Sequence, residues 1–165
     1  MSNQKVTKHT ISVLVNDEPG ALARVIGLFT GRGYNIDSLT VAPVNLEKKH
    51  SRIIIVTSGS QMIIEQIISS LERLIQVHKV VDLSSKNSTD ERELAIVKVS
   101  FKKDKQSNIK KIAKKFKAKP IFENLKNLAF EITDSPDNIN AFIFKLNILG
   151  KIDVSRTGLI AILKD

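Results

Sequence analysis

The chain of 165 residues contains no cysteine and no tryptophan, and it has only one tyrosine and four prolines. The absence of cysteine excludes disulfides, thiolate metal sites and a cysteine nucleophile. Because no run of about 18 or more uncharged apolar residues occurs, a membrane-spanning helix is also excluded. The polar residues 1–9 lack the apolar segment of a secretory signal. These absences predict a cytoplasmic protein that makes no contact with a membrane.

Residues that could catalyse a reaction are also scarce. His9, His50 and His78 stand apart in the sequence, at or next to predicted strands, without the spacing of a metal site. No serine has the sequence context of a nucleophile elbow. The glycine-rich residues 27–33 follow a predicted helix, whereas phosphate-binding loops precede one. We therefore expect no catalytic residue, no metal site and no cofactor in this chain, which argues against an enzyme acting alone.

A polar stretch near the middle divides the chain. Residues 84–90 contain no apolar side chain, which is typical of a linker. Since 42% of all residues are hydrophobic, each half can form a buried core. The predicted organisation is an N-terminal domain over residues 8–84, a linker over 85–92 and a C-terminal domain over 93–165.

In the N-terminal half, residues 10–15, 35–44, 52–57 and 77–83 have the composition of strands. Residues 53–56 are all apolar, which indicates burial on both faces of a sheet. Two helices are predicted between these strands, the first ending at Gly31 and Gly33 and the second starting at Ser60. Their apolar residues recur at helical spacing: Leu22, Val25, Ile26 and Phe29 in the first, and Ile64, Ile67, Ile68, Leu71 and Ile75 in the second.

The C-terminal half repeats this order of elements. Residues 94–101, 120–125 and 128–133 are predicted strands, and residues 159–163 are expected to close the sheet. Ser135 and Pro136 provide a cap and a first residue for a helix that ends at Gly150. The apolar residues of the two helices are Ile109, Ile112, Ala113 and Phe116, then Ile139, Phe142, Ile143 and Leu146. The predicted fold class is α+β, with tandem ferredoxin-like β-α-β-β-α-β domains, each an antiparallel sheet with both helices on one face.

The loop between the first strand and the first helix has the composition of a ligand site. The loop and the start of the helix consist of Asp17, Glu18, Pro19, Gly20, Ala21 and Leu22. Pro19 suits the start of a helix, and either acidic residue can cap it. Backbone N–H groups in the first turn attract an anion such as a small carboxylate. Asn35 offers a donor and an acceptor for an amino-acid head group. An ordinary strand-to-helix connection, with Asn35 capping a turn, explains the same residues.

The sequence around this loop resembles the N-terminal ACT domain of acetolactate (acetohydroxyacid) synthase small subunits. The similar segments are residues 20–29 and 32–41, the second of which reads RGYNIDSLTV and is the more specific. Residues 91–94 are similar to the Glu-Arg-Glu-Leu run that opens the family's C-terminal, ACT-like domain. Near the end, residues 154–158 resemble a family pattern that contains Ser155, Arg156, Thr157 and Gly158.

The resemblance implies a regulatory subunit in branched-chain amino acid biosynthesis. Such subunits bind and activate a catalytic large subunit that condenses two pyruvates to acetolactate, and they confer feedback inhibition by valine or a related amino acid. Thiamine diphosphate, Mg and FAD are then expected on the large subunit and not on this chain. The effector lies between two paired ACT domains, so the resemblance also implies a homodimer.

By resemblance, the loop from Asp17 to Leu22 of one chain and Asn35 with Ile36 of its partner form the effector pocket. Backbone N–H groups near Gly20 and Ala21 are expected to take the carboxylate of the effector. Many family members have Asn at the position of Asp17. Asn can donate to a carboxylate and ionised Asp can only accept, so this difference bears on the affinity for valine.

The net charge of +9 leaves two alternatives. Nine lysines between Lys102 and Lys119 carry much of the excess, which allows a nucleic-acid-binding module. On a helix, Lys110, Lys111, Lys114, Lys115 and Lys117 lie away from the apolar face, which includes Phe116. Lysine without arginine or exposed aromatics is poorly suited to reading bases, so a solvated face or an acidic protein surface is favoured. A free-standing amino-acid sensor with tandem ACT-like domains is the other alternative.

Overall fold

A computed structural model describes residues 6–84 and 89–164, which form two compact units. The first unit comprises the described residues up to Asp90 together with those from Leu159 onward, and the second comprises Glu91–Gly158. The predicted linker, residues 85–92, lies partly outside the described residues. Its last four residues, 89–92, are not a linker, because they already belong to strand β5 (Thr89–Ser100).

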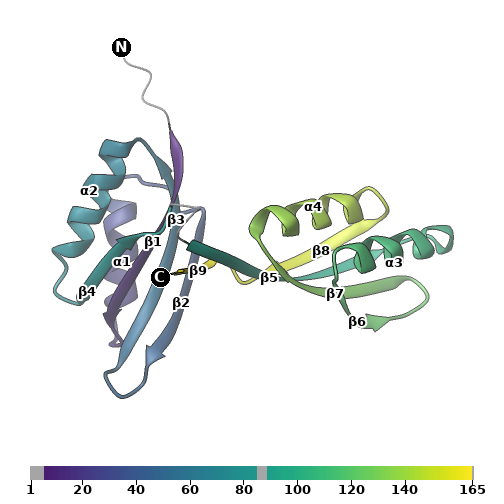
Figure 1. Cartoon of the computed structure of the whole chain (residues 1–165), viewed down its shortest axis with the longest axis horizontal. Helices are drawn as coiled ribbons and strands as arrows, with labels where there is room; N and C mark the ends of the chain where they lie inside the picture. Colours follow the sequence, from purple (N-terminus) through teal and green to yellow (C-terminus); the bar gives the residue numbers. More distant parts are fainter. Residues whose placement is uncertain (1–5, 85–88, 165) are drawn as a thin grey trace, which may run out of the picture. The chain divides into compact units, whose positions relative to one another are not determined.

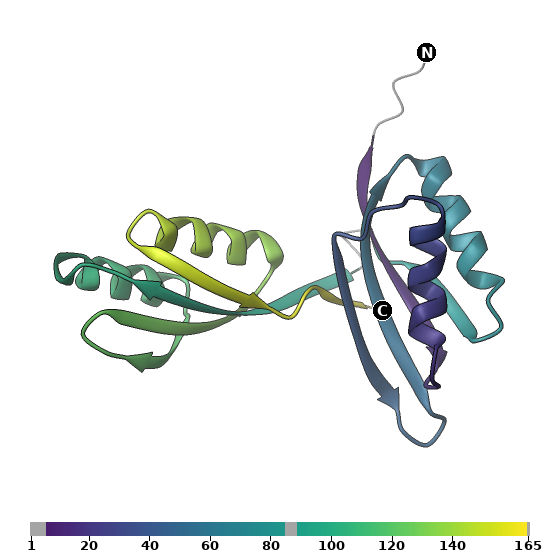
Figure 2. The same ribbon diagram turned by 180° about the vertical axis from the view of Figure 1, so that it is seen from behind.

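The first unit has the predicted order of elements. It contains β1 (Thr7–Asn16), α1 (Ala21–Gly31), β2 (Ser38–Asn45), β3 (His50–Gly59), α2 (Gln61–Glu72) and β4 (Val77–Asp82). The strands form an antiparallel sheet in the order β2-β3-β1-β4. Both helices pack on one face of this sheet (Figures 1 and 2). The ferredoxin-like fold is therefore confirmed for this half.

The helical face of the first sheet holds the main core of this unit. Val25 and Phe29 of α1 and three residues of α2 pack against alternate residues of the central strands β1 and β3, such as Ile11 and Ile55. This pattern follows from the helical and strand periods in the sequence. Ile75, predicted on the apolar stripe of α2, is 90% exposed. The helix ends at Glu72 and the chain turns toward β4, so the helical spacing no longer applies at Ile75.

The other face of the first sheet is also covered. Ile54, Val56 and Leu83 form a small second core there with Leu159, the residue before β9 (Ile160–Leu163). The prediction that residues 53–56 are buried on both faces is thus confirmed. The prediction that residues 159–163 close the second sheet is confirmed only in part. β9 does belong to that five-stranded sheet, where it pairs with β5, but the segment groups with the first unit, and Leu159 packs against Ile54 and Val56.

The second unit repeats the order of elements. After β5 come the 3₁₀ helix η1 (Lys103–Lys105), α3 (Gln106–Lys115), β6 (Lys119–Glu123), β7 (Asn127–Asp134), α4 (Pro136–Asn147) and β8 (Lys151–Arg156). This five-stranded sheet runs β6-β7-β5-β8, with β9 paired to β5 off this path, and β8 takes the edge position that was predicted for residues 159–163. β8 has only two inward apolar residues, Ile152 and Val154, so its sequence signal is weak.

Two turns explain how α4 is placed. Ser135 caps the helix as predicted, its Oγ accepting a hydrogen bond from the N–H of Asn138 at 3.4 Å. At the other end, a Cβ on Gly150 would lie 2.2 Å from the carbonyl oxygen of Ser100. Only glycine lets the chain pass so close to β5 before β8 begins.

Candidate functional site

The loop between β1 and α1 is fully exposed and is held at its start by the backbone. The N–H of Asp17 donates to the carbonyl of Lys49 at 2.7 Å. Gly20 is the N-cap of α1, with φ of 87°, and no side chain caps this helix. The predicted capping by Asp17 or Glu18 is therefore wrong, because Gly20, which has no side chain, occupies the N-cap position. Both carboxylates remain exposed to solvent.

The first turn of α1 keeps part of its predicted capacity to bind an anion. The N–H of Ala21 donates to the carbonyl of Glu18 at 3.2 Å, so this group, expected to take a carboxylate, is already used within the loop. Arg24 donates to the carbonyl of Gly20 at 3.0 Å, as the first regular bond of the helix. Within the described residues, the N–H groups of Leu22 and Ala23 have no recorded acceptor. These two N–H groups are therefore the donors still available to an anion at the N-terminus of α1, which is the positive end of the helix dipole.

Asn35 and Ile36 lie in the segment between α1 and β2. The Nδ2 of Asn35 donates to Asp37 at 2.6 Å, and its carbonyl accepts from the Oγ1 of Thr57 at 2.6 Å. Asn35 is exposed, and Ile36 packs against the edge of the main core, as does Leu22. The side chain of Asn35 is thus oriented by Asp37.

Within one chain the two parts of the predicted pocket lie at opposite ends of the sheet. The loop follows Asn16, which pairs with His50 at the start of β3. Asn35 is bonded to Thr57, seven residues further along β3. At about 3.3 Å per residue, roughly 23 Å separates these two levels of the sheet. A single chain therefore does not bring Asp17 and Asn35 together.

A pair of histidines beside the loop was missed from the sequence. The rings of His50 and His78 have centroids 4.3 Å apart, and Nε2 of His78 is hydrogen-bonded to Oδ1 of Asn16. No local pattern predicts this pair, because β1 pairs with both β3 and β4, which brings together residues 28 positions apart. Among the described residues, no three potential metal ligands gather around this pair or elsewhere.

Two of the motif residues singled out from the sequence meet in the second unit. Glu93, at the start of β5, is 6% exposed and binds Arg156 of β8 through two hydrogen bonds, Nε–Oε1 at 2.8 Å and Nη2–Oε2 at 2.6 Å. Thr157 also accepts the N–H of Leu94 at 3.1 Å. These contacts join the first and last strands of the unit, so we assign the motif a structural role.

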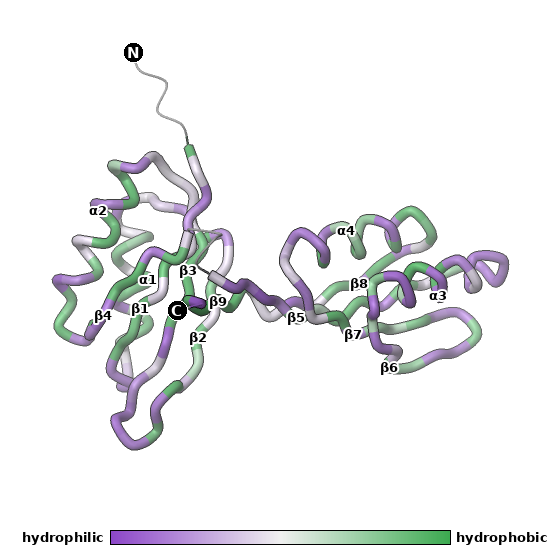
Figure 3. Tube along the Cα trace, in the orientation of Figure 1, coloured by the Kyte–Doolittle hydropathy of each residue, from purple (hydrophilic) through white to green (hydrophobic). Residues whose placement is uncertain are grey.

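The lysines of α3 lie on its solvent side, as predicted. Lys110, Lys111, Lys114 and Lys115, and Lys117 just after the helix, are exposed. Ile109 and Ala113 are buried, and the ring of Phe116 contacts that of Phe142 in the core at an angle of 46°. Figure 3 shows hydrophilic residues along α3, interrupted by hydrophobic ones. Lys110 donates to Glu123 at 2.7 Å, and this hydrogen bond lowers the pKa of the Glu123 carboxyl. No helix of the described chain is long and apolar enough to cross a membrane.

Comparison with known proteins matches both halves of the chain to a single kind of protein. Residues 11–79 match the profile of a family described as AHAS small subunit-like ACT domain, and residues 92–165 match the profile described as small subunit of acetolactate synthase. The first match includes the loop and Asn35, and the second includes Glu93 and Arg156.

Individual relatives match over nearly their full length. A probable acetolactate synthase small subunit of Archaeoglobus fulgidus is 37% identical, with 95% of this chain and 97% of the relative covered. The acetolactate synthase small subunit of Mycolicibacterium smegmatis is 38% identical, with 98% and 94% covered. The crystal structure of the acetolactate synthase small subunit from Thermotoga maritima matches with a TM-score of 0.86 at 33% identity, covering 96% of this chain and 98% of that chain.

Proposed function

The chain belongs to the family of acetolactate synthase small subunits, and from this premise we propose that it binds and activates a catalytic large subunit in the cytoplasm. The large subunit holds thiamine diphosphate, Mg and FAD and condenses pyruvate to acetolactate. This chain serves as its regulatory subunit in branched-chain amino acid biosynthesis. The observation that carries the proposal is that both units match the family.

The proposed effector is valine or a related amino acid, held between two copies of the first unit. The N–H groups of Leu22 and Ala23 take the carboxylate, and the exposed carboxylate of Asp17 takes the ammonium. Leu22 of one chain and Ile36 of its partner receive the branched side chain. Burial of such a side chain contributes about 1.5–3 kcal/mol, so the polar contacts must supply the rest of the specificity.

The position of β2 supports a pocket shared by two chains. β2 is an edge strand, and edge strands present unpaired backbone groups that favour pairing. Asn35 precedes the start of β2, while the loop lies at the level of its end, where Asn45 pairs with His50. Antiparallel pairing of β2 with the partner's β2 reverses these ends. Asn35 and Ile36 of one chain are then brought to the loop of the other.

The reconstituted complex tests the proposal. Purified chain is mixed with its cognate large subunit, and acetolactate formation is measured with and without valine. We expect stimulation by the chain and inhibition by valine. Absence of stimulation under all conditions contradicts the regulatory role and favours a free-standing sensor.

Asp17 provides the sharper variant for the effector site. If Asp17 takes the ammonium, Asp17→Asn weakens valine inhibition by about tenfold, which corresponds to about 1.4 kcal/mol. Stimulation of the large subunit stays unchanged. The matched control is Asp104→Asn, an exposed residue of η1 in the other unit, which leaves both properties unchanged. Stronger inhibition in Asp17→Asn would instead place this side chain at the carboxylate.

The lysines of α3 fit an acidic surface of the large subunit. With five exposed lysines on one short segment, their contribution is electrostatic and weakens as salt is added. Changing Lys111 and Lys114 to Gln is expected to lower the affinity for the large subunit most strongly at low salt. Salt-dependent binding of the isolated chain to DNA or RNA would favour the nucleic-acid alternative.

A further inference from the structure

A cavity of about 270 Å³ lies on the face of the first sheet that is opposite to its helices. Its floor is formed by β1, β3 and β4, and one wall is formed by Ala161, Ile162 and Leu163 of β9. All of its lining residues belong to the first unit. The proposed effector site uses the loop and β2, so this cavity is separate from it.

The sheet register places two cations side by side in this cavity. Leu14 of β1 pairs with Arg52 of β3 on one side and with Lys79 of β4 on the other. Directly opposed residues have Cβ atoms about 4.5–5.5 Å apart, so Arg52 and Lys79 flank Leu14 in one row. In the next row, Val81 and Ser12 also line the cavity. The result is a basic end beside an aliphatic wall.

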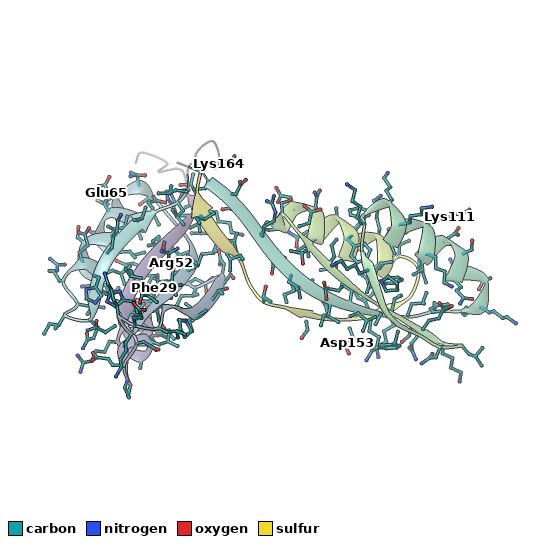
Figure 4. The ribbon with its side chains drawn as sticks, turned by 60° about the horizontal axis from the view of Figure 1, so that its bottom comes forward. Phe29, Arg52, Glu65, Lys111, Asp153 and Lys164 are labelled. Atoms are coloured by element: carbon teal, nitrogen blue, oxygen red, sulfur yellow. The ribbon has the colours of Figure 1, made fainter. Side chains whose placement is uncertain are left out.

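Arg52, which is labelled in Figure 4, carries a buried donor atom that makes no hydrogen bond with the described residues. Its Nε is buried and has no hydrogen-bond partner among the described residues. A buried donor without an acceptor is costly, more so when it belongs to a charged group. Such unsatisfied groups are rare in native proteins and call for an explanation. Because the Nε atom itself has almost no accessible surface, an anion in the cavity would contact the part of Arg52 that lines it, beside Lys79.

The lining also selects among anions. The described residues around the cavity include no Asp or Glu, so an ammonium group would find no ionic partner there and would face two cations. A free amino acid is therefore disfavoured. Val81, Ala161 and Leu163 provide apolar contact for a short alkyl chain. The arrangement is the reverse of the proposed effector site, where Asp17 is present to take an ammonium.

We propose that this cavity binds an aliphatic monocarboxylate that has no amino group, such as a branched short-chain acid or a 2-oxo acid. The carboxylate lies against the guanidinium of Arg52 and is attracted by Lys79, while the alkyl group lies against β9. Because β9 forms one wall, the bound acid also holds the C-terminal strand against the sheet. The chain thereby has a second small-molecule site, which does not depend on the effector site proposed above.

Isothermal titration calorimetry of the full chain tests this proposal, with sodium isovalerate as the probe. Isovaleramide has the same shape without the charge, and valine adds the ammonium. We expect isovalerate to bind and isovaleramide to bind at least about tenfold more weakly, since the amide lacks the negative charge of the carboxylate. Valine, added in excess beforehand, should leave the affinity for isovalerate unchanged, because its ammonium disfavours this cavity. Arg52→Gln should weaken isovalerate binding by a similar factor. Arg73→Gln, at the end of α2 on the other side of the sheet, should not.

Several results would overturn the proposal. These are no isovalerate binding to the unchanged chain, equal affinity in Arg52→Gln, or equal affinity for isovaleramide. Inorganic phosphate that binds as tightly as isovalerate would show a nonspecific anion site and would also overturn it. If Arg52→Gln does not fold, Lys79→Gln replaces it, because Lys79 is exposed and its loss should weaken binding severalfold without harming the fold. Valine inhibition of the complex is measured in parallel and should be the same in all these variants.

Discussion

The two units share one order of elements but differ in what covers the outer face of the sheet. In the first unit, Ile54 and Val56 on that face are buried beneath Leu159 and β9. In the second unit, the corresponding face carries an exposed ion pair between Lys98 and Asp153, with 2.8 Å between Nζ and Oδ2. The difference is visible in the burial of the strands, because every residue of β3 from Ile53 to Thr57 is buried, whereas buried residues alternate with more exposed ones along β5. One topology therefore serves both a sheet covered on two faces and a sheet with one polar face.

A second comparison concerns the pair that joins the first and last strands of each unit. In the first unit, Ile11 pairs with Asp82, and His9, two residues earlier, binds that carboxylate at 3.0 Å. In the second, Ala95 pairs with Arg156, and Glu93, again two residues earlier, binds that guanidinium. The pair has the same position in both units. The first strand supplies the basic partner in the first unit and the acidic partner in the second. The geometry of the sheet, and not the residue type, decides where such a pair forms.

The largest effect is expected from breaking the pair of the second unit. Arg156→Gln leaves the Glu93 carboxylate buried without its cation, and we expect the second unit to lose about 3–5 kcal/mol of unfolding free energy. Urea unfolding followed by hydrogen exchange in each unit measures this. Lys98→Gln breaks an exposed pair on the same sheet and should cost less than about 1 kcal/mol. Equal costs for the two variants would contradict the structural role of Glu93.

The next effect tests the two outer faces directly. Ile54→Ala should destabilise the first unit by about 2–5 kcal/mol, because its side chain is 4% exposed beneath the C-terminal segment. Ile96→Ala, on the outer face of the second sheet at 42% exposure, should cost less than about 1 kcal/mol. The same unfolding measurement compares them. Similar losses would show that the second sheet is also covered.

Replacing either of two glycines by alanine is expected to change stability, in opposite directions at the two positions. Gly150→Ala places a Cβ against the carbonyl of Ser100 and should destabilise the second unit by about 1–3 kcal/mol. Gly27→Ala, inside α1 of the first unit, meets nothing within 4 Å and should stabilise its helix by roughly 0.5–1 kcal/mol. Thermal unfolding of both variants is the measurement. Stabilisation by Gly150→Ala would mean that α4 and β5 separate more easily than their contact suggests.

The smallest effect on stability is expected from lowering the pH. In the second unit, a hydrogen bond from Asn138 lowers the pKa of Asp134, and Lys98 lowers the pKa of Asp153. A folded-state pKa below the unfolded value adds stability above the unfolded pKa of about 4, and this stability is lost as the pH falls through the folded pKa. We expect the urea concentration at the unfolding midpoint of the second unit to decrease as the pH is lowered from 5 to 3. Asp134→Asn should flatten this decline, and an unchanged slope would exclude Asp134 as a cause.

Much of the fold was predictable because its signals are local. The helical spacing of Val25 with Phe29 and of Ile139 with Phe142 marks helices whose buried faces lie where expected. Ser135 and Pro136 mark the start of α4 as predicted. The errors fall where local spacing stops applying, as at Ile75 after the end of α2, or where a strand has a weak pattern, as in β8. For the candidate site, the structure shows that the loop and Asn35 are exposed, and whether they bind an effector remains a prediction.

The sequence by itself determined the order of elements, the buried run of β3 and the family, because these depend on residues close together in the chain. Only the tertiary structure decided where β9 lies, because its pairing with β5 and the packing of Leu159 against Ile54 and Val56 join residues far apart in the chain. It also decided that Asp17 and Asn35 stand at opposite ends of one sheet and that Arg52 and Lys79 flank Leu14. Strand register joins residues far apart in sequence, and no local pattern contains it.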